Sequence, residues 1–114
     1  MEKVDLKFIK GDTFLKGFVI ENYEPEITQL YFTVKEKTTD KKFVIQKRLN
    51  EGIKRDEDNP NRYILTIDPS DTDNLKVKTN YVYDIQLVGD IKRTIIGGYV
   101  YLEDWDVTSK VNEV

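Results

Sequence analysis

The sequence contains no cysteine and no histidine among its 114 residues. Without cysteine there can be no disulfide and no thiolate metal site, so packing alone must hold the core together. Without histidine the chain lacks the commonest metal ligand, the usual general base near neutral pH and any serine-hydrolase triad. We therefore predict a protein that is not an enzyme, with no catalytic residue, no cofactor and no metal site.

Long apolar runs and blocks of like charge are also missing. No stretch is long enough to cross a membrane, and the start of the chain, MEKVDLKFIKGD, lacks the apolar core of a signal peptide. Charged residues make up 34% of the chain, with both signs mixed and a formal net charge of -3. Because no basic patch stands out, we expect no nucleic-acid partner and no membrane partner.

Two groups of carboxylates and one pair of glycines resemble functional motifs only superficially. The acidic groups are Asp56, Glu57 and Asp58, and Asp68, Asp71 and Asp73. Neither group continues as an EF-hand loop, which needs a glycine at its sixth position and a glutamate at its twelfth. We interpret them as solvated loop acids and helix caps. The pair Gly97–Gly98 lacks the lysine and serine or threonine of a phosphate loop, so it predicts a bulge or a close approach between strands.

Alternation of apolar and polar residues is the main positive signal. Tyr63, Leu65 and Ile67 alternate with polar or exposed positions, which is the period-2 pattern of half-buried strands. Turn residues separate about seven such segments, as in an antiparallel β-sandwich. The predicted strands are Val4–Ile9, Thr13–Glu21, Ile27–Glu36, Lys42–Leu49, Arg62–Ile67, Asn80–Val88 and Arg93–Leu102. At this length we expect one domain over residues 1–108, followed by a polar tail over residues 109–114.

One short helical turn is expected between two of the strands. Asp68 suits the cap position of a helix over Pro69–Leu75, proline suits its first position, and Asp71 stands where a capping-box acid belongs.

The alternation also predicts which side chains face the core. The expected inward set is Phe14, Phe18, Ile20, Leu30, Phe32, Val34, Ile45, Leu49, Tyr83, Val100 and Leu102. Lys16 shares this parity, so either a bulge at Gly17 turns it outward or its stem snorkels past the edge of the core.

The opposite parity places a set of apolar side chains on the outer face of a sheet. We predict a contact surface made of Tyr31, Val82, Ile95, Tyr99 and Tyr101. Exposed aromatic patches mark binding surfaces. The tyrosines could instead be isolated among charged neighbours, and they could also form a platform on which sugar rings stack.

Several segments together resemble a known family. KGDTF at Lys10–Phe14, LYFTVKEK at Leu30–Lys37, YILTIDPSDTDNL at Tyr63–Leu75, YVYDIQL at Tyr81–Leu87 and TIIGGYVYLEDWDVT at Thr94–Thr108 occur in this order. Their order and spacing resemble the immunoglobulin-like domains of bacteriophage tails and baseplates. The resemblance is strongest to the N-terminal domain of baseplate upper proteins of Gram-positive phages and prophages.

The resemblance implies an immunoglobulin-like β-sandwich with a structural role in a virion. Expected partners are other tail or baseplate proteins or further copies of the same chain, with a glycan as the alternative ligand. The expected location is the virion, and the host bacterial cytoplasm during assembly.

Overall fold

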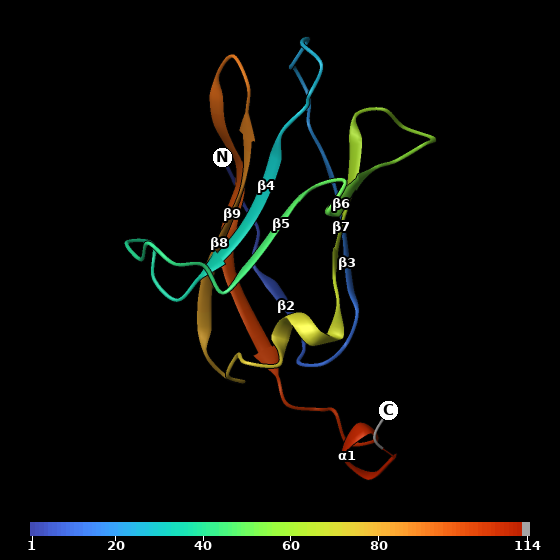
Figure 1. Cartoon of the computed structure of the whole chain (residues 1–114), viewed down its shortest axis with the longest axis vertical. Coiled ribbons are helices and arrows are strands. Elements are labelled where there is room, and N and C mark those ends of the chain that lie inside the picture. Colours follow the sequence, from blue (N-terminus) through green and yellow to red (C-terminus); the bar gives the residue numbers. More distant parts are fainter. Residues whose placement is uncertain (113–114) are drawn as a thin grey trace.

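The computed structural model describes residues 1–112, and about half of them lie in β-strands (Figure 1). The strands are β1 (Glu2–Lys3), β2 (Leu6–Ile9), β3 (Phe14–Val19), β4 (Leu30–Lys35), β5 (Ile45–Leu49), β6 (Gly52–Arg55), β7 (Arg62–Ile67), β8 (Asn80–Val88) and β9 (Lys92–Glu103). Two single helical turns complete the fold, the 3-10 helix η1 (Pro69–Thr72) and α1 (Ser109–Asn112). No helix in the described part of the chain is long and apolar enough to span a membrane.

The strands form one strongly curled mixed sheet in the order β1-β9-β8-β4-β5-β6-β7-β3, with β2 also paired to β9. The prediction of a purely antiparallel sandwich is wrong in this respect, because β1 and β2 run parallel to β9 and β5 runs parallel to β6. Only the pairs Arg48↔Gly52 and Leu49↔Ile53 join β5 to β6. The chain turns there through Asn50, whose φ is +71°, and Gly52, whose φ is +101°. This narrow join makes the sheet continuous where two separate layers were expected.

Only Leu6–Ile9 of the predicted strand Val4–Ile9 form a strand, β2, and β1 is a further strand that precedes the predicted range. Between β1 and β2, the chain at Val4 and Asp5 approaches β9 unusually closely. A Cβ on Gly98 would lie 2.9 Å from the carbonyl carbon of Val4, so only glycine permits this approach. The Val4 N–H donates to the Gly97 carbonyl at 3.0 Å, and the Asp5 side chain accepts from the Tyr99 N–H at 3.0 Å. The prediction of a close strand approach at the glycine pair is confirmed.

Most of the other strand predictions are confirmed to within a few residues. The predicted strands Arg62–Ile67 and Asn80–Val88 match β7 and β8, whereas β6 was missed inside a segment expected to be a loop. The predicted helix is confirmed over Pro69–Thr72, and the Asp71 carboxylate accepts from the Asp68 N–H at 2.7 Å. The first four residues of the predicted tail form α1, and positions 113–114 lie outside the described residues.

The core fills the concave side of the curled sheet with side chains from eight of the nine strands. All of the predicted inward residues are buried except Phe14 and Leu49, which are partly buried and pack against the core. The register of β3 with β7 runs unbroken from Phe14↔Ile67 to Val19↔Arg62, so there is no bulge at Gly17. Lys16 therefore keeps its inward parity and is partly exposed at the edge strand, as expected if its stem snorkels.

Candidate functional site

The outer face of strands β9, β8, β4 and β5 carries most of the predicted contact residues. Val82 on β8 pairs directly with Tyr99 on β9, and on its other side with Lys35 on β4. The Tyr99 side chain is 43% exposed, which is high for a large apolar ring within a sheet. Val82 and Tyr99 thus form one apolar patch on this face.

Tyr31 and Tyr101 lie away from that patch. Tyr31 pairs with Gln86 and Arg48, and Tyr101 pairs with Asn80 and Lys7. Both rings are partly exposed, as the alternation predicted. The three tyrosines are therefore not one continuous aromatic surface.

The placement of Ile95 on the outer face is wrong. The β8–β9 register shifts so that Ile85 pairs with Ile96 while Gln86 pairs with Thr94, which leaves Ile95 as the extra residue of a β-bulge. Its side chain is partly buried and packs against the core. Alternation counted along a strand fails at a bulge, because the extra residue shifts the parity of every position before it.

Each outer tyrosine has a cation over its ring. The Lys3 ammonium lies 5.4 Å from the centroid of Tyr99, and the Lys7 ammonium lies 5.8 Å from that of Tyr101. The Arg48 guanidinium carbon lies 5.8 Å from the centroid of Tyr31. These cation–π contacts cover part of each ring and leave Tyr99 the most exposed of the three.

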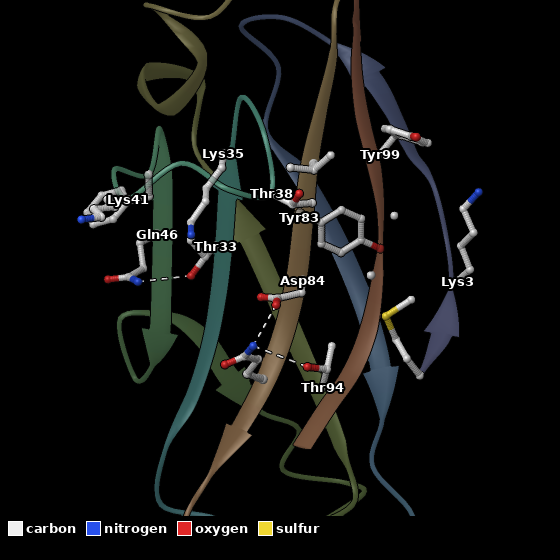
Figure 2. A pocket seen from close by; sticks show the side chains of 16 residues that line it. Lys3, Thr33, Lys35, Thr38, Lys41, Gln46, Tyr83, Asp84, Thr94 and Tyr99 are labelled. Carbon is white, nitrogen blue, oxygen red and sulfur yellow. Dashed lines mark hydrogen bonds between the residues drawn. The ribbon is translucent and has the colours of Figure 1, made fainter. Parts of the chain in front are cut away.

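A hollow of about 600 Å³ lies over the same face, beside the Val82–Tyr99 patch (Figure 2). Its size is within the range of roughly 300–1,000 Å³ that is typical of ligand pockets. Polar side chains of the sheet form part of its wall, and the loop between β4 and β5 adds Phe43, whose side chain is 55% exposed. Three lysines also line it: Lys3, Lys35 and Lys41.

The polar side chains in the hollow are joined by hydrogen bonds. The Gln86 amide donates to the Asp84 carboxylate at 2.9 Å and to the Thr94 hydroxyl at 3.4 Å. The Gln46 amide donates to the Thr33 hydroxyl at 3.2 Å. This row offers donors and acceptors for a polar ligand or for the backbone of a protein partner.

Among the described residues, Asp84 is the one carboxylate in the wall of the hollow. Partial burial raises the pKa of this carboxyl above its ordinary value, although the Gln86 hydrogen bond acts in the opposite direction. A glycosidase needs two carboxylates flanking the bond that it cleaves. Among residues 1–112 no second carboxylate lines the hollow.

Sequence reasoning missed the polar row, although a signal for it was present. Thr33, Asp84 and Gln86 share the outward parity that singled out Tyr31 and Val82. The cross-strand register that brings these polar residues together is not visible in the sequence.

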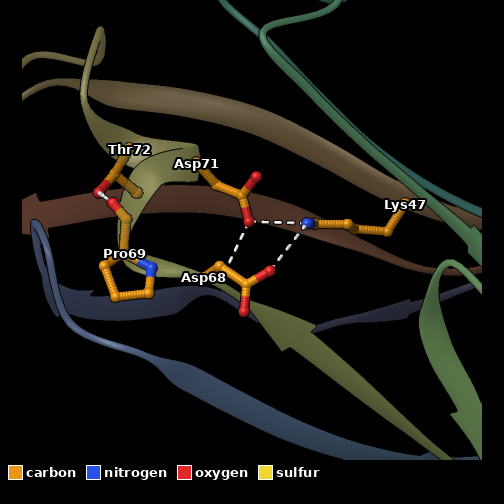
Figure 3. A network of polar contacts seen from close by, with 5 residues as sticks. All are labelled: Lys47, Asp68, Pro69, Asp71 and Thr72. Carbon is orange, nitrogen blue, oxygen red and sulfur yellow. Dashed lines mark hydrogen bonds and ion pairs between the residues drawn. The ribbon is translucent and has the colours of Figure 1, made fainter.

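The two acidic clusters have the structural roles that were expected. Asp56 forms a 2.9 Å ion pair with Arg62, and the Asp58 N–H together with the Arg62 guanidinium lowers the pKa of the Asp56 carboxyl. Asp71 pairs with Lys47 at 2.7 Å, and Asp68 lies 3.8 Å from the same ammonium (Figure 3). Within residues 1–112 no three acidic side chains are grouped as a metal site would require.

No protein-family model matches the chain, and no curated protein matches it.

Proposed function

We propose that this chain is a non-enzymatic structural protein of a bacteriophage or prophage. It acts as a tail or baseplate component through protein–protein contacts, in the virion and, during assembly, in the host bacterial cytoplasm. The observation that carries the proposal is the exposed Val82–Tyr99 patch beside a hollow on the outer face. The Tyr99 side chain has few rotatable bonds, so it loses little conformational entropy when a partner binds. It therefore suits the role of an interface anchor.

We further infer an immunoglobulin-like arrangement of the strands. One half of the curled sheet contains β9, β8, β4 and β5, with β2 running parallel to β9 at its edge. The other half contains β6, β7 and β3. This division supports a domain whose two halves face each other across the core, as in immunoglobulin-like domains.

The proposal is tested by the substitution Tyr99→Glu. A charge at the centre of the contact surface should weaken self-association or binding to adjacent tail proteins by about 30-fold or more if Tyr99 is a hot spot. Sedimentation velocity of the variant, alone and mixed with proteins encoded beside it, measures this. Ile91→Glu is the matched control, because Ile91 is 51% exposed near the β8–β9 turn and does not line the hollow. Unchanged assembly of Tyr99→Glu would contradict the proposed surface.

A second candidate function is glycan binding in the same hollow. The observation that favours it is the row of amide, hydroxyl and carboxylate groups beside two exposed rings, Phe43 and Tyr99. A clear hit on a glycan array that disappears in Tyr99→Ala would support this function. Assembly that depends on Tyr99 in the absence of any glycan would favour the structural one.

A further inference from the structure

The chain beyond β9 carries large apolar side chains that the rest of the molecule does not cover. Trp105 is 69% exposed, Val107 is 67% exposed and Val111 is 77% exposed. We call residues 104–112 the C-terminal arm. In Figure 1 this arm extends past the end of β9, and α1 lies apart from the sheet. An exposed tryptophan with further exposed apolar neighbours is typical of an interaction site.

The arm is nonetheless an ordered element. The Val107 N–H donates to the Trp105 carbonyl at 3.0 Å, and the Ser109 N–H donates to the Asp106 carboxylate at 3.1 Å. The Lys110 ammonium lies 3.3 Å from the Asp104 carboxylate. These contacts hold the arm in shape while leaving Trp105 exposed, so less conformational entropy is lost when a partner covers it.

The arm and the hollow complement each other in charge and in apolar character. Two carboxylates of the arm, Asp104 and Asp106, flank Trp105, and Glu103 precedes them at the end of β9. Glu103 pairs with Lys7 and Asp104 with Lys110, so the arm itself has two acidic side chains and one basic side chain. The hollow has three lysines around its exposed rings, and in residues 1–112 none of Lys3, Lys35 and Lys41 forms an ion pair. A lysine-lined hollow on a chain of net charge -3 suits an acidic segment with an apolar centre.

A molecule does not reach its own hollow with this arm. Trp105 follows the end of β9, and Glu103 lies four residue steps of extended strand, about 13 Å, from Tyr99. Asp106 lies beside Gly11, which follows β2 at the start of the turn to β3, and a Cβ there would be 3.2 Å from its carboxylate. The hollow is therefore free to receive the arm of another molecule.

We propose that the C-terminal arm of one copy docks into the outer-face hollow of a second copy, with Trp105 beside the Val82–Tyr99 patch. The proposal rests on the proposed structural function and names its partner as the chain itself. Because arm and hollow are different surfaces, the contact is head-to-tail and repeats into a ring or a filament.

The test compares two variants that each disable one side of the contact. Trp105→Ala removes the anchor, and the double variant Lys35→Glu, Lys41→Glu reverses the charge of the hollow through side chains that do not contribute to the core. Sedimentation velocity should show wild-type association that weakens about 30-fold in each variant. Leu15→Ala, which changes a side chain that is 63% exposed on β3, should associate like the wild type. Circular dichroism confirms that each variant is folded.

A mixture of the two variants gives the sharpest result. Each variant keeps one intact half of the contact, so the mixture should form a complex that stops at two chains. Wild-type association should also weaken as the salt concentration rises, because the complementary charges are screened. A wild type that stays monomeric at about 1 mM overturns the proposal. The proposal is also overturned if Trp105→Ala associates as strongly as the wild type, or if the mixture of the two variants stays monomeric.

Failure of the docking proposal can be distinguished from failure of the proposed function. If Tyr99→Glu weakens assembly and Trp105→Ala does not, the outer face is the interface but the arm is not its occupant. If Trp105→Ala weakens assembly and Tyr99→Glu does not, the arm binds elsewhere on the neighbouring copy and the docking proposal is overturned.

Discussion

The Tyr83 hydroxyl donates a hydrogen bond to the carbonyl oxygen of Val4, a residue 79 positions away in the sequence. Tyr83 belongs to β8 and its ring packs against Phe32 with the centroids 5.5 Å apart, so the side chain fills the core and also fastens the N-terminal segment. Burial raises the pKa of this phenol to about 12, so the hydroxyl remains a proton donor at neutral pH.

Truncating Tyr83 should destabilise the protein strongly. We expect Tyr83→Ala to lower the free energy of unfolding by roughly 3–5 kcal/mol, because it leaves a cavity where a buried ring was. Tyr83→Phe keeps the ring and removes only the hydrogen bond to Val4, so it should lower that free energy by about 1 kcal/mol. Urea denaturation of both variants measures the two contributions. A loss below about 1 kcal/mol for Tyr83→Ala would be incompatible with its place in the core.

The two adjacent glycines of β9 should differ in their tolerance of alanine. A Cβ on Gly98 would press on the Val4 backbone, whereas a Cβ on Gly97 would first meet the flexible end of Met1, at 2.9 Å. We expect Gly98→Ala to lower the free energy of unfolding by about 1–3 kcal/mol and to loosen β1. Gly97→Ala should lower this free energy by clearly less. Thermal unfolding and amide exchange over Glu2–Lys3 in both variants provide the comparison. Equal effects of the two substitutions would argue against the close approach.

Lys47 on β5 should stabilise the contact between β5 and η1 through its ion pair with Asp71. Its side chain is only 13% exposed, and its Nζ atom lies 2.7 Å from the Asp71 carboxylate (Figure 3). Lys47→Met keeps most of the apolar stem and removes the charge, so we expect a loss of about 1–2 kcal/mol. A double-mutant cycle with Asp71→Asn isolates the pair. Lys7→Met is the control, since its 3.9 Å contact with Glu103 is at the surface and should contribute less than about 0.5 kcal/mol.

Replacing Asp84 by asparagine should change how stability depends on pH. Burial raises the pKa of Asp84 in the folded protein, so the folded state binds its proton more tightly than the unfolded state does. The carboxylate therefore destabilises the fold at neutral pH, and this effect fades as the pH falls through the raised pKa. We expect Asp84→Asn to gain less than about 1 kcal/mol at pH 7, because solvent screens a half-buried carboxylate. Urea denaturation at several pH values should show that this gain in the free energy of unfolding becomes smaller as the pH falls. A gain that becomes larger at acid pH would mean that the pKa of Asp84 is lowered in the folded protein.

Features that depend on neighbouring residues in the chain were predictable from the sequence. The alternation in Arg62–Ile67 and Asn80–Val88 predicts both strands and their buried faces, since side chains in a strand point alternately to its two sides. The η1 turn follows from Asp68, Pro69 and Asp71, whose backbone and side-chain bonds span three residues. Tyr99 and Val82 were correctly placed on the outer face by the same alternation.

Features that depend on strand pairing were not predictable in this way. The Ile95 bulge, the missed strand β6 and the parallel pairing of β1 and β2 with β9 all depend on backbone contacts between distant segments. Backbone hydrogen bonds are nearly the same for every residue type, so side-chain patterns say little about which strands pair or in what register.

The sequence by itself determined that this protein is rich in β-structure, which side chains fill most of its core, and that neither histidine nor cysteine chemistry is available to it. Tertiary structure alone decided that the strands join into one curled mixed sheet, and that Asp84, Gln86 and Thr94 meet beside Tyr99 in a hollow. The division has a physical cause. The burial pattern of a strand follows from the order of residues along the chain. The hollow, in contrast, exists only where the register of several strands brings distant side chains to the same face.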